Sequence, residues 1–530
     1  MKFTKEYVLK KLIVLFMLLL VMFPHNIVKA ENDDGYITEE SYYEEDEGLD
    51  YFTISNGVLV KYFGEGGNVI IPDNVIDIGA NAFANSEVTS ITMTNNVKSI
   101  GNYAFSKCNK LKSIKLSDNL EEVGGYSFEY CTALKEINIP SKVKSLGYGT
   151  FEYCKNLSKI KLSNNIETIG SGCFTGTKWI ENQRKKNPLV IVSGILIDGN
   201  KSKGKVNIPT SVKHINEDAF TFSNLKEVVI PNSVESIGDY AFSGCYSLEK
   251  IKISKSVNNF GINSFNGTIW MDNQRKKNPL VIVNGILIDG KMCTGKVTIP
   301  KNVKQINQYA LSYADINEVV ISKSVTSIGD NAFYRCKKLS KISIPKSVKT
   351  FGVNCFSGTS WLKNQQKKNS LVILNGVLID GTTCKGNITL PNSVKYINDN
   401  AFVNADGLIS ITISENVTGI GNSAFSSCDK LTQVNLPENL IKIESNAFCD
   451  CISLKEIAIP SSIKELPDSV FQNCKNLDKI ELPQNVIIFG KDCFKDCSNL
   501  TIYGYADSDV ERYAKQYCIS FSYLSLEKTE

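Results

Sequence analysis

Apolar residues recur along this chain with a period of 23 residues. In the segment Leu134 to Leu157 they follow the pattern L-x-x-I-x-I-P-x-x-V-x-x-I-G-x-x-A-F-x-x-C. Ile137 and Ile139 alternate with polar residues, which predicts a short β-strand with one buried face. A repeat of about 20 to 29 residues with fixed apolar offsets is typical of a solenoid, because each unit buries its apolar face only by stacking on its neighbours.

The rest of the unit predicts how the chain returns to the next coil. Pro140 ends the strand because it has no backbone donor for a ladder. Val143 and Leu146 return to the core, and we expect Gly147 to permit a turn that a bulkier residue would strain. A phenylalanine position then recurs, with Leu311 in its place once, at Phe83, Phe105, Phe128, Phe151, Phe174, Phe220, Phe242, Phe265, Phe333, Phe356, Phe402, Phe425, Phe448, Phe471 and Phe494. At a spacing of about 4.8 Å, about 20 such coils give a rod or arc on the order of 90 Å long.

A second period of 91 residues lies on top of the first. Three similar cassettes, at about residues 173–199, 264–290 and 355–381, hold all three tryptophans of the chain, Trp179, Trp270 and Trp361. Each also holds Ser-Gly or Asn-Gly between two apolar runs, which predicts a tight β-hairpin. Asn56-Gly57 resembles the back half of a cassette. We therefore predict that this hairpin starts the solenoid and restarts it three times.

The two ends of the chain differ from the repeats. Residues 1–30 combine a basic start, an apolar run of 12 residues and small residues before Glu31, which indicates a signal peptide. The alternative is a membrane anchor, but a spanning helix needs about 20 apolar residues. Residues 502–526 predict a cap over the last coil, with a short helix at 510–517, an N-cap at Asp507, Ser508 or Asp509, and a final strand at 518–523.

Charge is distributed unevenly. The chain has 59 basic and 55 acidic residues. Residues 1–30 hold five lysines and one glutamate, and residues 31–50 hold ten acidic residues and no basic ones. That leaves ten more basic than acidic residues in 51–530. We expect 31–50 to be a disordered acidic leader, either a spacer or an arm that folds back on a basic body, and 51–501 to be the solenoid.

The repeated unit resembles the BspA-like leucine-rich repeat family of bacterial surface proteins. The resemblance covers about residues 52–500 and includes the closing YGYADSDVERYAKQYCISF. It implies a right-handed leucine-rich repeat solenoid, built from mainly short strands with turns and a few short helices. It also implies a secreted or surface location and a role in adhesion or host interaction. The shared positions are the buried ones, so the resemblance assigns no binding residue.

Sixteen cysteines in a secreted chain would ordinarily indicate disulfides. However, nine of them share one repeat position, where leucine-rich repeats place a small buried group: Cys108, Cys131, Cys154, Cys245, Cys336, Cys428, Cys451, Cys474 and Cys497. Neighbouring coils bring such residues within disulfide reach, but stacked parallel side chains rarely have the required dihedral angle. We predict free buried thiols, with the off-position Cys449 and Cys493 as the exceptions.

Signs of catalysis are scarce. After removal of residues 1–30, His214 is the one remaining histidine, at a position that we expect to be exposed. A Ser-His or Cys-His nucleophile pair would have to be built on it. The sequence has no phosphate-binding G-x-x-x-x-G-K-[ST] loop, and its cysteine spacings suit no metal. We predict that the protein is not an enzyme and needs no cofactor or metal.

The best candidates for binding are the basic runs of the cassettes. They comprise Arg184, Lys185, Lys186, Arg275, Lys276, Lys277, Lys367 and Lys368. Recurring about every 20 Å along one side, they could hold a polyanion such as teichoic acid or a host glycosaminoglycan. The alternative is that each run is the solvated face of a short helix whose tryptophan packs inward. Nucleic acid is a poorer candidate for a secreted chain.

The outward residues of the strands give no sharper indication, since they are Lys, Glu, Ser and Asn without an aromatic stripe. We predict a secreted protein, with no membrane segment after the signal, that binds a host surface protein or glycan or a cell-envelope polyanion, and that is free or non-covalently held at the cell surface. The alternative function is a structural envelope component that binds its own wall polymers or other copies of itself.

Overall fold

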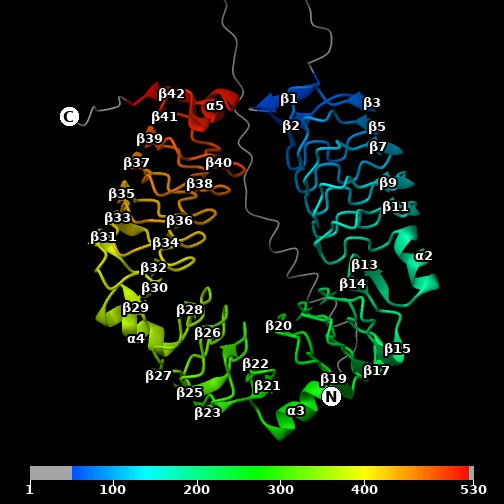
Figure 1. Ribbon diagram of the computed structural model, residues 1–530, viewed down its shortest axis with the longest axis vertical. Coiled ribbons are helices and arrows are strands. Elements are labelled where there is room, and N and C mark those ends of the chain that lie inside the picture. Colours follow the sequence, from blue (N-terminus) through cyan, green and yellow to red (C-terminus); the bar gives the residue numbers. More distant parts are fainter. Residues whose placement is uncertain (1–50, 56, 525–530) are drawn as a thin grey trace, which may run out of the picture. The chain divides into compact units, whose positions relative to one another are not determined.

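Each coil consists of two short strands joined by turns, as the coil that begins at Leu134 illustrates. In the computed structural model, which describes residues 51–55 and 57–524, β9 (Glu136–Asn138) is followed by β10 (Ser145–Leu146). Ile137, Ile139, Val143 and Leu146 are all buried. The predicted repeat solenoid of mainly short strands is therefore confirmed (Figure 1). The signal peptide and acidic leader predicted for residues 1–50 lie outside the described residues.

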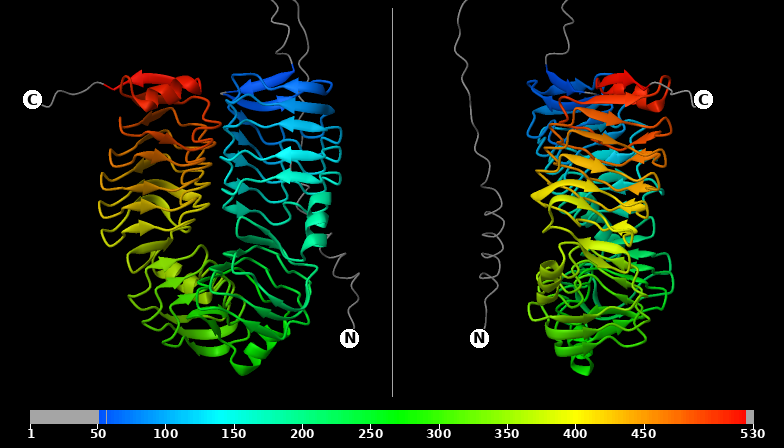
Figure 2. Two further views of the ribbon diagram at one scale, coloured as in Figure 1. Left: turned by 45° about the vertical axis from the view of Figure 1, so that its right-hand side comes forward. Right: turned by 90° about the vertical axis from the view of Figure 1, so that its left-hand side faces the viewer.

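Neighbouring coils pair in parallel at the period that the sequence predicts. β9 pairs with β11 (Lys159–Lys161) so that Glu136 lies opposite Lys159, 23 residues later. Figure 2 shows the successive coils stacked as layers. The other strands of this first ladder are β3 (Gly67–Ile70), β5 (Val88–Thr92), β7 (Ser113–Lys115), β15 (Lys203–Asn207), β17 (Asn224–Val229), β19 (Lys250–Lys252), β23 (Thr294–Thr298), β25 (Asp315–Val320), β27 (Lys341–Ser343), β31 (Lys385–Thr389), β33 (Gly407–Thr412), β35 (Gln433–Asn435), β37 (Glu456–Ala458), β39 (Lys479–Glu481), β41 (Thr501–Gly504) and β42 (Ser520–Tyr523).

A second ladder of two-residue strands runs along the coils. With β10, it comprises β4 (Asp77–Ile78), β6 (Ser99–Ile100), β8 (Glu122–Val123), β12 (Thr168–Ile169), β16 (His214–Ile215), β18 (Ser236–Ile237), β20 (Asn259–Phe260), β24 (Gln305–Ile306), β26 (Ser327–Ile328), β28 (Thr350–Phe351), β32 (Tyr396–Ile397), β34 (Gly419–Ile420), β36 (Lys442–Ile443), β38 (Glu465–Leu466) and β40 (Ile488–Phe489). Every one of these strands except β40 buries at least one of its two residues, so the second ladder also faces the apolar interior of the coils.

Antiparallel hairpins begin the successive stacks of coils. They are β1 (Phe52–Ser55) with β2 (Val58–Tyr62), β13 (Val190–Val192) with β14 (Ile195–Asp198), β21 (Val281–Val283) with β22 (Ile286–Asp289), and β29 (Val372–Leu374) with β30 (Val377–Asp380). The second strand of each pairs in parallel with the next coil. The turns of the last three are left-handed at both central residues, as tight hairpins require. The predicted start and three restarts are confirmed.

A short helix precedes each of the three internal hairpins: α2 (Lys178–Lys186), α3 (Ile269–Lys277) and α4 (Ser360–Lys368) (Figure 1). A threonine caps each helix, and the hydroxyl of Thr177, for example, accepts a hydrogen bond from the backbone N–H of Ile180. The tryptophan of each helix is buried against the phenylalanine before it, with ring centroids 4.6 Å apart for Trp179 and Phe174. The helix thus covers the end of a stack.

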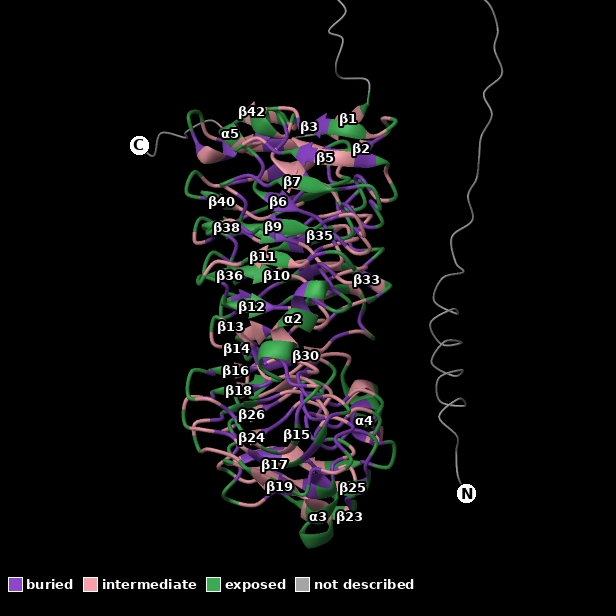
Figure 3. Ribbon diagram, turned by 90° about the vertical axis from the view of Figure 1, so that its right-hand side faces the viewer, coloured by how far each residue is buried: buried purple, intermediate pink, exposed green. Residues whose placement is uncertain are grey.

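The phenylalanines form ladders inside the coils. The rings of Phe105 and Phe128 are 5.2 Å apart and nearly parallel. The ladders stop at the cassettes, and the apolar interior divides into four cores, whose boundaries lie at the hairpins, between Ile195 and Leu196, Ile286 and Leu287, and Val377 and Leu378. Figure 3 shows the buried residues along the inside of the coils.

An asparagine, buried at two of the three positions, bridges each boundary. Asn216, Asn307 and Asn398 stand where most other coils have glycine, one coil after each hairpin. Each side-chain amide donates to a backbone carbonyl 47 residues earlier, as Asn307 Nδ2 does to Phe260 O at 2.8 Å. The hairpin interrupts the backbone ladder there, so this amide bond links the stacks on its two sides.

The repeat glycine has a different role from the one that the sequence suggested. Gly147 does not have a left-handed φ, so turn strain is the wrong explanation. A Cβ at this position would lie 2.4 Å from the backbone nitrogen of Gly125 in the preceding coil. At Gly147 a side chain would therefore force the two backbones apart, and this close approach explains the glycine.

The cysteines are free thiols, as predicted for the repeat position. The thiol of Cys131, for example, donates to the carbonyl of Phe105 at 3.2 Å, and burial raises the pKa of Cys428 to about 12. Cys449 and Cys493 are free as well, so the expectation that they differ is wrong. Cys493 is buried and donates to the carbonyl of Gly490 at 3.0 Å, which resembles the bonding of the other thiols.

The chain ends in the helix α5 (Asp509–Gln516), which is followed by β42. Of the three N-cap candidates, Ser508 is the cap, since its hydroxyl accepts from the N–H of Glu511 at 3.2 Å. Tyr513 of α5 packs on Phe489 with ring centroids 4.0 Å apart, and it also lies edge-on to Phe494, the last phenylalanine of the ladder. The helix therefore covers the final coil.

Candidate binding surfaces

The two cassette arginines turn inward, away from the basic surface predicted for them. Arg275 Nε and Nη2 donate to the two carboxylate oxygens of Asp289 at 3.0 and 2.8 Å. Arg184 binds Asp198 in the same way. The side chains of Arg275 and Asp289 are 21% and 5% exposed, and their hydrogen bond raises the pKa of Arg275. Such fork-to-fork pairs fix the helix on the hairpin that follows it.

The third cassette lacks this ion pair. Gln366 replaces the arginine and donates one hydrogen bond to Asp380 Oδ1 at 3.1 Å. The hydroxyl of Thr382 gives Asp380 a second neutral donor at 3.1 Å. Burial raises the pKa of Asp380, because no cation compensates for the loss of water around this carboxylate.

The six lysines of the predicted site remain on the surface. Lys185, Lys186, Lys276, Lys277, Lys367 and Lys368 are all exposed and occupy the last turn of their helices. In Figure 3 much of α2 and α3 has the colour of exposed residues. Within the described residues none of the six forms an ion pair, so their charges are available to a ligand. Part of their effect is local, since a cation near a helix C-terminus is favoured by the helix dipole.

His214 does not lie where the sequence suggested. It is half-buried in the second ladder rather than exposed, because its ring packs beside the next coil and Nδ1 lies 2.8 Å from the hydroxyl of Ser236. Among residues 51–55 and 57–524, no group of His, Cys, Asp and Glu side chains could hold a metal ion.

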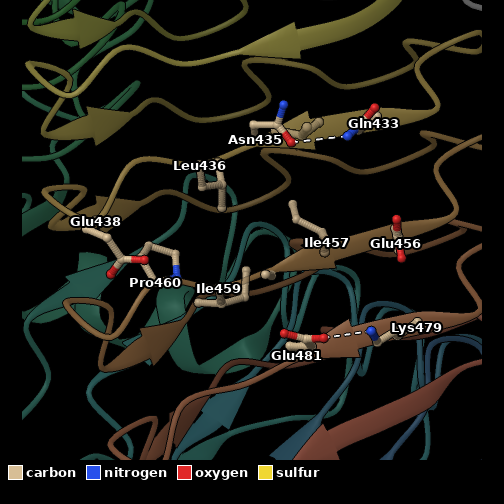
Figure 4. Close-up of a pocket in the computed structure, with 12 residues that line it drawn as sticks. Gln433, Asn435, Leu436, Glu438, Glu456, Ile457, Ile459, Pro460, Lys479 and Glu481 are labelled. Carbon is tan, nitrogen blue, oxygen red and sulfur yellow. Dashed lines mark hydrogen bonds and ion pairs between the residues drawn. The ribbon is translucent and has the colours of Figure 1, made fainter. Parts of the chain in front are cut away.

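The strand face is polar, as predicted, but it contains a hollow that the sequence analysis missed. This hollow, of about 330 Å³, lies over β35, β37 and β39 (Figure 4). Ala458 occupies a position at which the neighbouring coils have Asn435 and Glu481. The short side chain leaves the space open, and an alanine at an outward strand position is the signal that could have revealed it.

Hydrogen-bonding groups surround the hollow. Gln433 Nε2 donates to Asn435 Oδ1 at 3.3 Å, and Lys479 pairs with Glu481 at 2.7 Å (Figure 4). Glu438 and Glu456 also line it. Its polar groups largely satisfy one another, so the hollow offers a shallow site for a polar ligand and no arrangement typical of catalysis.

The part of the chain that the structure describes contains no helix that is both long and apolar enough to span a bilayer.

Comparison with protein families identifies the repeat. A model described as the BspA type leucine-rich repeat region, in six copies, matches residues 68–191, 199–275, 291–408 and 380–501. These ranges cover more than half of the chain. No curated protein matches the sequence significantly.

Several solved structures are similar in part. A leucine-rich cell surface protein from Faecalibacterium prausnitzii is 20% identical, with 91% of this chain and 98% of that one covered and a TM-score of 0.28. A leucine-rich repeat protein from Bacteroides ovatus is also 20% identical, with 93% and 100% covered and a TM-score of 0.28. The pneumococcal vaccine antigen PcpA is 17% identical, with 63% and 93% covered and a TM-score of 0.31.

Proposed function

Because the chain belongs to the BspA type leucine-rich repeat family, we propose that it is a non-catalytic binding protein, secreted or held at the bacterial cell surface, that engages a polyanionic glycan or envelope polymer. The observation that carries the proposal is the set of six exposed lysines at the ends of α2, α3 and α4, none of which pairs with a carboxylate of residues 51–55 or 57–524. The same capping threonine and the same buried tryptophan position all three pairs.

The inward direction of the two arginines limits the proposed site to the lysines. Asp198 and Asp289 neutralise Arg184 and Arg275, so the positive charge offered to a ligand comes from the lysines alone. One lysine pair binds an anion weakly in water. Three pairs on one rigid solenoid contact one polymer together, so their contributions combine and the binding depends strongly on salt.

The test compares two variants of equal charge. In the first, Lys185, Lys186, Lys276, Lys277, Lys367 and Lys368 become serine while both arginines stay. In the matched control, six other exposed lysines become serine: Lys98, Lys301, Lys323, Lys346, Lys349 and Lys464. Binding to heparin, host cells and the producing organism's own wall is measured at low and high salt.

We expect salt-sensitive binding that the first variant loses and the control keeps. Equal loss in both variants would mean that net charge alone attracts the polymer, and binding unaffected by either would move the site to the strand face. Retention on the organism's own wall alone would favour a structural envelope component over a host-binding protein.

A further inference from the structure

A pocket of about 430 Å³ lies beside the second cassette, and none of the helix lysines lines it. Tyr240, Tyr309, Tyr313, Asn263 and Lys291 line it. The tyrosines come from the turns of two coils, and Lys291 comes from the loop directly after β22. The volume is in the range of small-ligand sites, which are mostly apolar and hold a few well-placed polar groups.

Lys291 places a positive charge in this pocket without a carboxylate partner. Its side chain is half-buried, and Nζ donates to the neutral Asn263 Oδ1 at 2.6 Å. Burial lowers the pKa of Lys291. The nearby Asp289 is already held by Arg275, and within the described residues Lys291 forms no ion pair. A half-buried ammonium group in this state would gain from an anion.

The tyrosines occupy positions that their backbone does not favour. Tyr240, Tyr309 and Tyr313 have φ values of 53°, 54° and 63°, in the left-handed region where bulky residues are uncommon and cost on the order of 1 kcal/mol. The same turn positions in later coils carry residues that tolerate this region, such as Asn400 and Asn446. Tyrosines of earlier coils, such as Tyr103 and Tyr126, share this conformation, so it is a feature of the repeat turns and does not by itself mark a site. The turn does not require tyrosine, since asparagine also occupies it.

The other cassettes lack these residues at the equivalent positions, 91 residues away. Tyr240, Tyr309, Tyr313 and Lys291 correspond to Gly149, Asp218, Phe222 and Asn200 in the first, and to Asn331, Asn400, Asn404 and Thr382 in the third. At these positions the backbone N–H groups of Asn200 and Thr382 donate to Asp198 and Asp380, and neither side chain carries a positive charge. The capping threonine and the buried tryptophan are nevertheless the same in all three, so the pocket chemistry differs where the supporting structure does not.

We propose that this pocket binds a sugar ring that carries a carboxylate. The Lys291 ammonium group would pair with the carboxylate, the tyrosine rings would pack on the apolar face of the sugar, and their hydroxyls and Asn263 would meet its hydroxyl groups. Arg335 lies over the ring of Tyr334, 5.2 Å from its centroid, and Tyr334 packs edge-on to Tyr313. A second cation thus stands near the rim.

A peptide strand suits the pocket less well. It would need free backbone donors, as in strand addition. The backbone N–H groups of Tyr240, Tyr309 and Tyr313 already donate to Ile262 O, Asp330 O and Tyr334 O in the next coil. The available groups are therefore side chains, which suits a ligand with a ring, hydroxyls and one negative charge.

The proposal is independent of the polyanion site, because it uses none of the helix lysines. The test uses the intact protein and oligosaccharides that end in glucuronic acid or in sialic acid, each compared with its carboxyl-reduced form, by calorimetry or saturation-transfer NMR. The two variants, Lys291→Thr and Tyr313→Asn, introduce the residues found at the equivalent positions of the third cassette. Thermal melting checks that both variants fold. The control variant changes Lys346 and Lys349, two exposed lysines that belong to neither proposed site, to serine.

We expect saturable binding of at least one acidic sugar, with Lys291→Thr weakening it about tenfold or more and removing the preference over the reduced form. Tyr313→Asn should weaken binding of acidic and reduced sugars by similar factors, and the lysine control should change neither. The proposal is overturned if neither acidic sugar binds at millimolar concentration, or if binding survives Lys291→Thr with its preference intact.

Discussion

The ion pair between α3 and the hairpin that follows it should decide how firmly this helix is held. Replacing Arg275 by Gln creates in the second cassette the arrangement that the third has naturally. The change removes both charge-assisted hydrogen bonds to Asp289, whose side chain is 5% exposed. A glutamine can return one neutral hydrogen bond, as Gln366 does to Asp380.

The magnitude follows from these contacts. Removing one partner of a buried pair costs about 3–5 kcal/mol, because the other charge stays buried. One retained hydrogen bond offsets about 1 kcal/mol of that cost. Arg275 is also about one-fifth exposed, which lowers the figure further. We expect α3 to lose about 2–3 kcal/mol of local stability.

Hydrogen exchange followed by mass spectrometry measures this locally. Amides of α3 that exchange through local opening should do so about 30 to 150 times faster in Arg275→Gln, because each 1.4 kcal/mol changes the opening equilibrium tenfold. Peptides from α2 and α4 in the same molecule are the internal control. Unchanged exchange in α3, or an equal change in all three helices, would refute the structural role of the pair.

Three further predictions test other parts of the fold. Burial raises the pKa of Asp380 in the folded protein, so this carboxyl group stabilises the fold fully below its unfolded pKa of about 4, and that stabilisation is lost as pH rises through the folded pKa. In urea titrations, Gln366→Arg should therefore stabilise the protein by about 1.5 kcal/mol at pH 7 and by less at pH 4. Gly147→Ala should cost about 2 kcal/mol or more in the same assay, whereas Gly125→Ala, whose Cβ meets nothing closer than 3.2 Å, should cost less. Ellman's reagent should modify the exposed Cys518 quickly and the thirteen buried cysteines only after unfolding, and rapid reaction of many thiols in the folded protein would contradict their burial.

Local and periodic features were predictable from the sequence. The strands, the buried phenylalanines and the hairpins at Ser193, Asn284 and Asn375 depend on residues within one coil or its nearest copy, so their spacing reveals them. The inward direction of Arg184 was not predictable, because its partner Asp198 is 14 residues away across a helix and a hairpin.

Features that depend on which coils are neighbours were missed as well. The hydrogen bond between Lys291 and Asn263 forms because the loop after β22 folds back on the coil before α3. No sequence motif indicates that contact. Gly147 illustrates the same limit. A side chain at this position would clash with the backbone of Gly125, 22 residues earlier in the chain. Sequence patterns identify which positions are buried, whereas the three-dimensional stacking determines what buries them.

The four separate apolar cores have a mechanical consequence. The second and third cores, from Leu196 to Ile286 and from Leu287 to Val377, each span one 91-residue unit. Each boundary is crossed by an asparagine amide and by the bond from the cassette arginine or glutamine to its aspartate, and not by a continuous apolar core. Solenoids unfold piecewise where the coupling between neighbours is weak. A chain pulled between two surfaces would therefore extend in steps, and each of these units would release about 320 Å of extended polypeptide. Such stepwise extension would limit the peak force on whatever the protein holds.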